Sequence, residues 1–250
     1  MAEPSSESVA DLRLSVVVCT YNRESFLPDC LRSLAAQSAS RSDYEVVLVD
    51  NRSTDGTAAI VREFAEEHPE LALRYILEKR QGLSFARNRG MAEARHALIT
   101  YIDDDAVASE SFVASVLSFF RRHPDAYAAG GKVLARFAGL RPDWFNPYSA
   151  SLFFSHYDPG DRLFRYGGKG YPIGCNMSFR ASWLRQSGGF DTDLGRKGKG
   201  GVGAEEKELF LRLYREGHPV YFDPAQVVEH QIDRGVNNLS HSGSAWGGTP

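Results

Sequence analysis

Short apolar, β-branched runs alternate with segments of helical periodicity over the first hundred residues, and this alternation restricts the fold more than any other feature. The expected strands are Leu12–Thr20, Tyr44–Asp50, Leu73–Leu77 and Ala97–Ile102. The expected helices are Pro28–Gln37, a segment from the Ser53–Gly56 caps to about Glu67, and Leu83–Arg95. Strands that alternate with helices pair in parallel through right-handed crossovers. We therefore predict an α/β fold in which helices flank a mostly parallel sheet.

Polar groups follow three of these strands directly. They are Thr20-Tyr21-Asn22-Arg23, Asp50-Asn51 and Asp103-Asp104-Asp105. In open parallel sheets ligands bind at the carboxyl ends of the strands, so the three groups are expected to line one crevice. Three consecutive carboxylates repel one another, and a divalent cation with oxygen ligands explains them. The alternative is an acidic turn that caps the next helix.

The pattern changes after residue 108. A further amphipathic helix is expected over Ser109–Arg122, followed by an aromatic, irregular stretch over Asp143–Tyr171. The Gly-rich, basic segment Arg196–Gly203 precedes a helix over Glu205–Glu216 and short strands at Val220–Phe222 and Val227–Glu229. We expect a loop-rich second half that packs on the first sheet, between a disordered tail at residues 1–11 and a loosely structured tail at residues 231–250.

Composition narrows the functional classes. The net charge of -3 gives no electrostatic case for nucleic acid binding. The three cysteines (Cys19, Cys30 and Cys175) have no metal-type spacing, and we interpret them as reduced thiols in a reducing compartment. The first residues are polar and unlike a signal peptide, and no apolar run approaches the ~18 residues of a membrane span. We expect a cytoplasmic protein, with peripheral membrane contact left open.

Eight motifs occur together in order: VVVCTYNR, LVDNRSTDGT, GLSFARNRG, YIDDDA, PIGCNMSFR, GGFD, GAEEKELFLRL and DPAQVVEH. In this combination the chain resembles the family 2 glycosyltransferases, which have the GT-A fold, from about Leu14 to His230. The resemblance implies one domain over residues 12–230, with a nucleotide-binding half (12–108) and an acceptor-binding half (109–230). It also implies a nucleotide-sugar donor and an inverting transfer.

The resemblance assigns most of the strand-end residues to the donor. Asp50 is expected to accept the N3–H of uracil, and Asp103 to hold the ribose. The other residues implied in nucleotide binding are Thr20, Tyr21, Asn22, Arg23, Arg87, Asn88 and Asp104. Tyr21 offers a face for stacking and Arg23 a cation for the diphosphate. For Arg87 the alternative is a solvated, charged helix face. Asp55 is better explained as a helix cap.

Asp105 and His230 are the metal ligands that the resemblance implies. One carboxylate, one imidazole and phosphate oxygens suit Mn²⁺ or Mg²⁺. Such an ion neutralises charge on the nucleoside-diphosphate leaving group.

Inversion requires one carboxylate to deprotonate the acceptor hydroxyl. The Glu-Asp pair of the family appears here as Glu205-Glu206. At 100° per residue, Glu206 falls on the buried face of the helix with Leu209 and Leu213, whereas Glu205 points about a quarter turn away. We therefore predict Glu206 as the base. The alternative is that both acids simply favour the helix N-terminus, which explains Glu205 better than Glu206.

The stretch from Gly174 to Ser178 resembles the part of the family that lies beside the sugars, and Trp144 is a candidate for sugar stacking. Arg196, Lys197 and Lys199 are candidates for a lid over the diphosphate. The predicted protein is a metal-dependent inverting glycosyltransferase that moves a sugar, most simply from a UDP-sugar, to a saccharide, lipid-linked or peptide-linked acceptor. Two rivals are a nucleotidyltransferase, which would carry a Gly-rich phosphate loop after the first strand, and a non-catalytic nucleotide-sugar-binding module.

Overall fold

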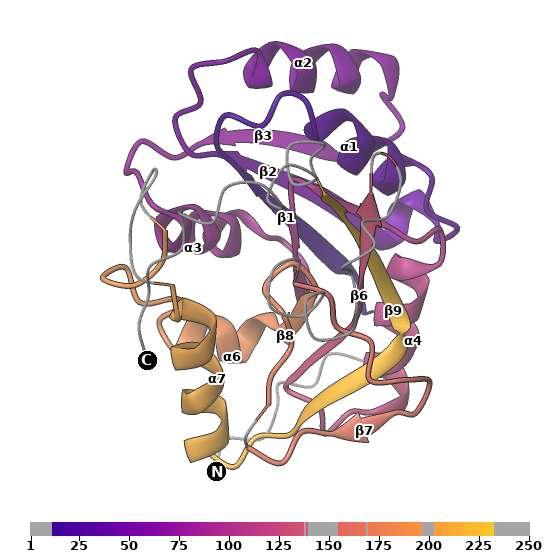
Figure 1. Ribbon diagram of the computed structural model, residues 1–250, viewed down its shortest axis with the longest axis vertical. Helices are drawn as coiled ribbons and strands as arrows, with labels where there is room; N and C mark the ends of the chain where they lie inside the picture. Colours follow the sequence, from indigo (N-terminus) through magenta and orange to yellow (C-terminus); the bar gives the residue numbers. More distant parts are fainter. Residues whose placement is uncertain (1–11, 138, 140–154, 169, 197–202, 233–250) are drawn as a thin grey trace.

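A computed structural model describes residues 12–137, 139, 155–168, 170–196 and 203–232, and within these residues a single nine-stranded mixed sheet runs through the molecule (Figure 1). The strand order is β3-β2-β1-β4-β8-β6-β9-β5, and β7 also pairs with β9. The strands are β1 (Leu14–Thr20), β2 (Tyr44–Asp50), β3 (Leu73–Leu77), β4 (Leu98–Asp103), β5 (Ala106–Ala108), β6 (Ala128–Phe137), β7 (Phe164–Arg165), β8 (Met177–Arg180) and β9 (Val220–Ile232).

The first four strands confirm the predicted parallel arrangement. β1 pairs in parallel with both β2 and β4, and β2 pairs in parallel with β3. Each strand begins or ends within two residues of the predicted bounds, because a β-branched, fully buried run leaves little choice of conformation.

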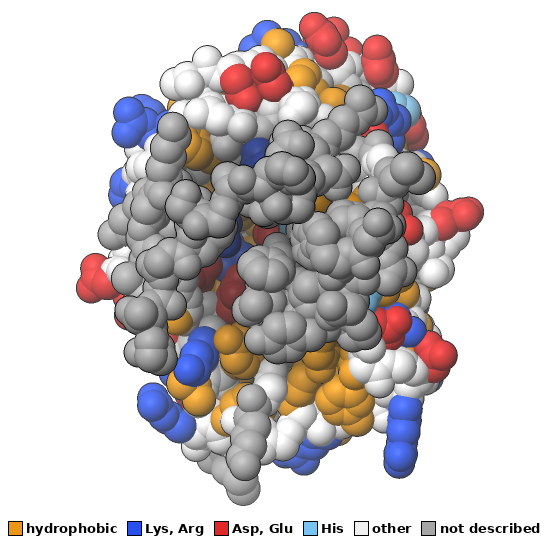
Figure 2. All heavy atoms as spheres, in the orientation of Figure 1, with side chains coloured by type: hydrophobic (Ala, Val, Ile, Leu, Met, Phe, Trp, Pro, Cys, Tyr) orange, Lys and Arg blue, Asp and Glu red, His pale blue; other side chains and the backbone are white. Residues whose placement is uncertain are grey.

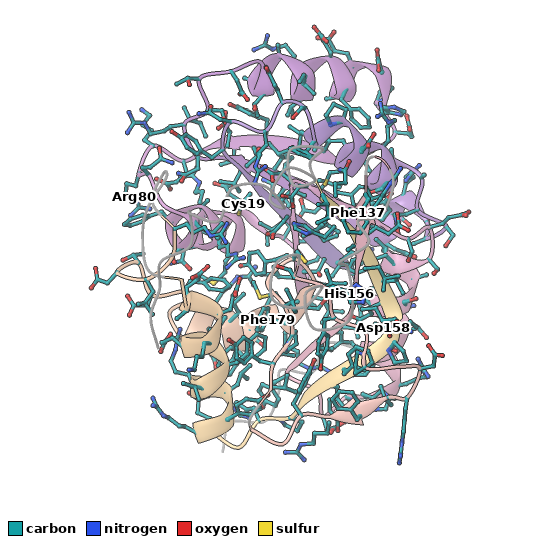
Figure 3. The ribbon with its side chains drawn as sticks, viewed as in Figure 1. Cys19, Arg80, Phe137, His156, Asp158 and Phe179 are labelled. Atoms are coloured by element: carbon teal, nitrogen blue, oxygen red, sulfur yellow. The ribbon has the colours of Figure 1, made fainter. Side chains whose placement is uncertain are left out.

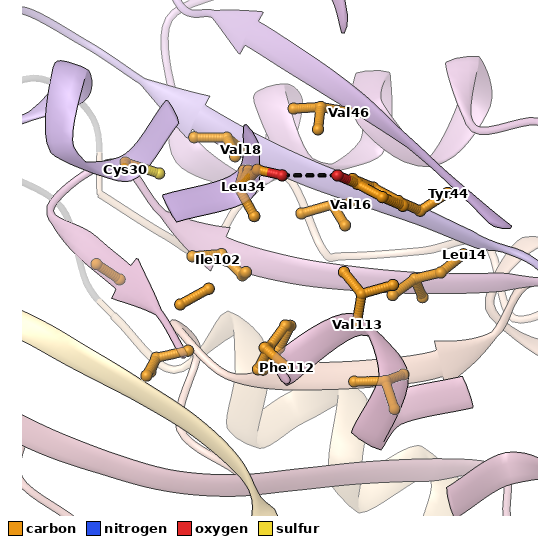
Figure 4. Packing of buried hydrophobic residues seen from close by; sticks show 14 of the residues in the cluster. Leu14, Val16, Val18, Cys30, Leu34, Tyr44, Val46, Ile102, Phe112 and Val113 are labelled. Atoms are coloured by element: carbon orange, nitrogen blue, oxygen red, sulfur yellow. Dashed lines mark hydrogen bonds between the residues drawn. The ribbon is translucent and has the colours of Figure 1, made fainter. Parts of the chain in front are cut away.

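Helices cover both faces of this sheet, and alternate strand residues face opposite layers. On one face the core includes residues of α1 (Leu27–Ala35), α2 (Thr57–Glu67) and α4 (Phe112–Arg122). On the other face it includes residues of α3 (Leu83–Glu93), α6 (Ala181–Gln186) and α7 (Glu205–Arg215). A single 3₁₀ turn, η2 (Arg41–Asp43), precedes β2. In the first core the Tyr44 hydroxyl donates to the Leu34 carbonyl at 2.8 Å, which ties β2 to α1 (Figure 4).

The second half completes the same sheet with antiparallel and long-range pairings. β8 pairs antiparallel with both β4 and β6, and β6 runs parallel to β9. β5, β6, β7 and β8 were not among the expected strands. The two strands expected at Val220–Phe222 and Val227–Glu229 form one continuous strand, β9. The glycines of β6 and the register shift between Gly130 and Lys132 interrupt the alternation that would reveal these strands.

Some predictions fall on residues outside the description. Gln231 and Ile232 belong to β9, which corrects the expected start of the C-terminal tail, and residues 233–250 lie outside the described residues, as do residues 1–11. Trp144, Lys197 and Lys199 also lie outside them. Cys19, Cys30 and Cys175 are free thiols. None of the helices in the described ranges is both long and apolar enough to cross a bilayer.

Candidate functional site

Residues from both halves of the chain meet at the carboxyl ends of β1, β2 and β4. The registers place Thr20 beside Asp50 and Cys19 beside Asp103. The antiparallel β5–β9 pair then sets Ala106 opposite His230. The chain turns sharply between β4 and β5, so His230 reaches Asp105 from a strand more than a hundred residues later. Cys19, labelled in Figure 3, lies at the end of β1 in this region, whereas Phe179 on β8 pairs with Ile99 near the start of β4 and belongs to the core.

Asp105 lies between two basic side chains. His230 Nε2 is 3.2 Å from Asp105 Oδ1, and Arg23 Nη2 is 3.5 Å from Asp105 Oδ2. Burial by itself would raise the pKa of Asp105, but the interactions with His230 and Arg23 hold this pKa below its usual value. The carboxylate is therefore ionised and available as a ligand at neutral pH.

The donor set around Asp105 fits a divalent ion that is shared with a substrate. Asp105 is buried, and His230 Nε2 lies 3.2 Å from its Oδ1, so a carboxylate oxygen and an imidazole nitrogen, two ligand types that divalent transition metals accept, lie side by side. Among the described residues no three or more His, Cys, Asp or Glu side chains form a metal-binding group. Mg²⁺ and related ions are commonly held by one or two protein ligands together with substrate phosphates and water, which matches this pair.

Asp103 and Asp104 are crowded acids. Burial, followed by the charge of Asp105, raises the pKa of Asp104 to about 8. Burial also raises the pKa of Asp103 to about 6, although the nearby Arg87 opposes the shift. The side chain of Asp103 is still 41% exposed and can meet a ligand. The triplet thus concentrates negative charge that a cation would relieve.

Arg87 is the centre of a second charge cluster. Its Nη1 is 3.0 Å from Glu205 Oε1, its Nη2 is 2.9 Å from Glu206 Oε1, and Nη2 is also 3.8 Å from Asp103 Oδ1. Arg87 is 2% exposed, so the alternative of a solvated helix face is wrong for this residue. The neighbouring acids raise its pKa despite burial, which keeps the guanidinium charged.

The orientation predicted for Glu205 and Glu206 needs correction. The Glu205 side chain is 5% exposed and Glu206 is 26% exposed, so the more buried acid is the one expected to point away. Arg212 pairs with Glu208 at 2.8 Å, whereas Glu205 pairs with Arg87. Glu205 and Glu206 are the first two residues of α7. Their side chains contact Arg87 of α3, whereas Leu209 and Leu213 enter the core, so the face expected from helical periodicity does not hold for the first turn.

Two of the expected donor contacts are engaged elsewhere. Asn88 donates from Nδ2 to the Phe190 carbonyl (2.7 Å) and accepts from the Phe190 N–H (2.8 Å), so this amide fastens backbone to backbone. Asp50 is 1% exposed; its Oδ1 accepts from the Ser53 N–H (2.7 Å) and its Oδ2 from the Tyr75 hydroxyl (2.5 Å).

The segment after β1 is partly open and partly structural. Thr20 is buried and its side chain interacts with Asp104, whereas Tyr21 is 38% exposed. Asn22 adopts a left-handed conformation (φ 54°), and its Oδ1 accepts from the Thr54 N–H at 2.7 Å, which joins this loop to the one after β2. Asp55 accepts from the Thr57 N–H at the start of α2, as expected of a cap.

Sequence reasoning missed two residues that shape the site. Asn51 was given little weight, yet its side chain accepts from the Gly82 N–H (2.7 Å) and donates to the Arg80 carbonyl (2.6 Å), so it holds the loop before α3. Tyr75 covers Asp50 from the edge strand β3; an exposed aromatic within a short strand gave no signal of this contact.

Gly174 passes directly beside the second cluster. A Cβ at this position would lie 1.8 Å from Glu206 Oε1 and 2.8 Å from Arg87 Nη2. Only glycine allows the backbone this close, as the small residues of this stretch suggested. In Figure 2 acidic and basic side chains lie recessed near the middle of the face shown, while charges of both signs alternate around the visible rim.

The chain is similar to known glycosyltransferases in sequence and in fold. Residues 15–188 match the model of the family described as glycosyl transferase family 2. The chain is 25% identical over 231 residues to the glucosyl-dolichyl phosphate glucuronosyltransferase of Haloferax volcanii (88% of this chain, 70% of that protein). It is 36% identical over 235 residues to the validoxylamine A glucosyltransferase of Streptomyces hygroscopicus subsp. limoneus, covering 83% of this chain but only 49% of that protein.

Among solved structures, the mannosyltransferase PcManGT from Pyrobaculum calidifontis, in complex with GDP-Man and Mn²⁺, superposes with a TM-score of 0.64 at 25% identity. The match covers 89% of this chain and 57% of that one, so this chain is shorter than several of the proteins that it resembles. The family match spans well over half of the chain, and the fold and the strand-end motifs agree with it. This chain is therefore a member of glycosyl transferase family 2 with the GT-A fold.

Proposed function

We propose that this protein is a metal-dependent inverting glycosyltransferase that uses a nucleoside-diphosphate sugar. The observation that carries the proposal is the convergence of Asp105, His230 and Arg23 at one strand end, next to the Arg87–Glu206 cluster. One group suits a cation and a diphosphate, and the other supplies a carboxylate to activate an acceptor.

The donor end is proposed to bind the diphosphate through a shared cation. Asp105 and His230 would hold Mn²⁺ or Mg²⁺, which supplies Lewis-acid stabilisation of the leaving group when bound. Arg23, whose side chain is 43% exposed, is free to turn from Asp105 toward a phosphate. Tyr21 offers an exposed ring for the base, and Asp103 an exposed carboxylate for the ribose.

Glu206 is the proposed base. Its Oε1 is fixed by Arg87, and the side chain is 26% exposed, so a hydroxyl can approach it. General-base catalysis needs the carboxylate within about 3 Å of the hydroxyl it deprotonates, and Gly174, which has no side chain, passes directly beside Glu206 Oε1.

The nucleobase of the donor is proposed to be uracil, bound through Asp50. A uracil N3–H needs a carboxylate oxygen, and the buried Asp50 becomes accessible if Tyr75, which is 39% exposed, swings away. PcManGT binds GDP-Man, so guanine is the competing outcome of the test below. The proposed acceptor is a saccharide or a lipid- or peptide-linked intermediate; the Haloferax relative is named for a lipid-linked substrate.

The test combines binding and turnover. UDP, GDP and TDP with Mn²⁺ or EDTA are compared by thermal shift, and release of nucleoside diphosphate from the matching sugar donors is then measured. We expect one nucleotide to stabilise the protein only with the metal. Stabilisation by none of them would contradict the proposal.

Glu206→Gln keeps the shape of the site but removes the base, so we expect loss of turnover with nucleotide binding retained. Glu208→Gln is the matched control, because Glu208 lies on the same helix and pairs with Arg212. Normal turnover by Glu206→Gln would remove Glu206 as the base. The absence of a Gly-rich loop after β1 counts against a nucleotidyltransferase, and turnover would exclude a mere binding module.

A further inference from the structure

We infer that Arg87 is a positioning residue for Glu206, and that Glu205 is the counter-charge that keeps Arg87 in place rather than a second base. This inference rests on the proposed function, in which Glu206 activates the acceptor. It reassigns Arg87 from the donor nucleotide, where the family resemblance placed it, to the base.

The two arms of the guanidinium are divided between two acids. Nη1 contacts Glu205 Oε1 at 3.0 Å, and Nη2 contacts Glu206 Oε1 at 2.9 Å. A planar guanidinium fixes the relative direction of its donors, so the position of one carboxylate determines that of the other.

Burial separates the roles of the two acids. Glu205 is buried, its side chain is 5% exposed, and its Oε2 has no hydrogen-bond partner among the described residues. An acceptor hydroxyl that enters from solvent cannot reach the Glu205 carboxylate unless α7 rearranges. Glu206 is 26% exposed, and among the described residues its Oε2 has no hydrogen-bond donor, so this oxygen is the one left for a hydroxyl.

Arg87 also contacts Phe190 and Tyr101. Its guanidinium lies 5.3 Å from the centre of the Phe190 ring, and its carbonyl accepts from the Tyr101 hydroxyl at 3.2 Å. The next residue, Asn88, makes two hydrogen bonds to the Phe190 backbone. The position of Glu206 is thus set by α3 and the Phe190 segment, with Gly174 closing the other side.

The same contacts argue against a phosphate on Arg87. Arg87 is 2% exposed, and both of its terminal nitrogens already face carboxylates. A diphosphate would have to displace Glu205 or Glu206, whereas Arg23 is exposed and nearer to the proposed cation ligands. Arg87 therefore acts on the transfer step through Glu206.

Arg87→Lys tests this directly, since lysine keeps the charge but cannot hold two carboxylates in one plane. We expect kcat for nucleoside-diphosphate release to fall about a hundredfold, because small misplacement of a reacting group has effects of this size. The Kd of the nucleotide that binds the wild type, measured by calorimetry with Mn²⁺, should stay within about twofold. Arg89→Lys, on the same helix and paired with Glu93 at 2.8 Å, is the matched control.

Two further variants separate positioning from a merely structural role. In the double variant Arg87→Lys/Glu206→Gln, turnover should be no lower than in Glu206→Gln alone, because Arg87 is inferred to act on the transfer step through Glu206, although Asp103 lies 3.8 Å from its Nη2. Glu205→Gln removes the counter-charge of Arg87 but retains an oxygen acceptor for it, so we expect kcat to fall, but by less than in Glu206→Gln.

Three results would overturn the inference. One is a rise in the nucleotide Kd of Arg87→Lys with kcat unchanged, which would mean a donor contact. Another is a loss of turnover in Glu205→Gln as complete as that in Glu206→Gln, with an unaltered melting temperature, which would make Glu205 a base. The third is a double variant clearly worse than Glu206→Gln alone. If Arg87→Lys does not fold, the Glu205→Gln result decides. Failure of the proposed function would differ from all of these, because the wild type itself would release no nucleoside diphosphate.

Discussion

Buried charged groups lie at both ends of the parallel strands, and the two groups differ in how far their hydrogen bonds are satisfied. At the amino end, Glu45 accepts from the Ser15 hydroxyl (2.8 Å), the Arg95 N–H (2.8 Å) and Arg74 Nε (3.2 Å). The Ser15 oxygen also accepts from the backbone N–H groups of Arg95 and His96. At the carboxyl end the acids are crowded instead: Asp103, Asp104 and Asp105 are consecutive, and within the described residues Glu205 Oε2 is buried without a hydrogen-bond partner.

This difference separates a structural network from a functional one. A buried polar group without a partner costs roughly 1–3 kcal/mol, so a chain retains such groups where a ligand completes them. The amino-end network is complete and needs nothing from solution. The carboxyl-end clusters are crowded, partly open and incomplete, as expected of a site awaiting a cation and a charged substrate.

The largest effect that would sharpen the contrast is expected from Asp105→Asn. This change removes the ionised cation ligand, and we expect nucleoside-diphosphate release to fall by at least about a thousandfold, with metal-dependent nucleotide binding lost. The unfolding transition should remain cooperative. Asp158→Asn, which changes a surface ion pair with Lys132, is the control. Turnover near the wild-type rate would show that Asp105 holds no cation.

Glu45→Ala is expected to have the opposite profile. The change leaves the buried Ser15 hydroxyl and the Arg95 N–H without their acceptor and Arg74 with Glu93 as its one remaining acid within the described residues, so the free energy of unfolding should fall by about 3 kcal/mol. The kcat per folded molecule should not change. Urea unfolding measures the first quantity, with the exposed Glu63→Ala as the control. A loss of kcat with normal stability would abolish the distinction between the two ends.

Tyr75→Phe should strengthen nucleotide binding if a base docks on Asp50. The Tyr75 hydroxyl occupies Asp50 Oδ2, and a hydrogen bond to a charged group contributes about 1.5 kcal/mol, so its removal predicts an affinity for UDP about tenfold higher. Calorimetry compares this variant with Tyr221→Phe, which loses a similar bond to Asp125 far from the site. Unchanged or weaker UDP binding would argue against Asp50 as the residue that contacts the nucleobase.

The smallest effect is expected from Ser15→Ala. The Ser15 side chain satisfies Glu45 and two backbone N–H groups, and its loss should lower the free energy of unfolding by about 1 kcal/mol. Urea unfolding of the variant beside the exposed Ser182→Ala gives the comparison. A neutral substitution would mean that Arg74 and Arg95 alone are sufficient to satisfy Glu45.

The sequence predicted the first half of the fold closely. β2 and β3 have the predicted bounds, and β1 and β4 differ by one or two residues. Buried β-branched runs and strand-end acids are local signals, so the carboxyl-end crevice followed from them. β5 was not predicted because it is only three residues long, and β6 because its glycines and bulge interrupt the period. The orientation of Glu205 was not predicted because it depends on Arg87, which is distant in the sequence.

The sequence by itself determined the parallel half-sheet, the placement of Asp103 to Asp105 at a strand end, and the family. The tertiary structure decided which side chains meet: β9 delivers His230 to Asp105, and Arg87 gathers Glu205 and Glu206. Local propensity is set by neighbouring residues, whereas these contacts join segments more than a hundred positions apart. Such contacts depend on the completed sheet, because only strand pairing and helix packing bring the segments together.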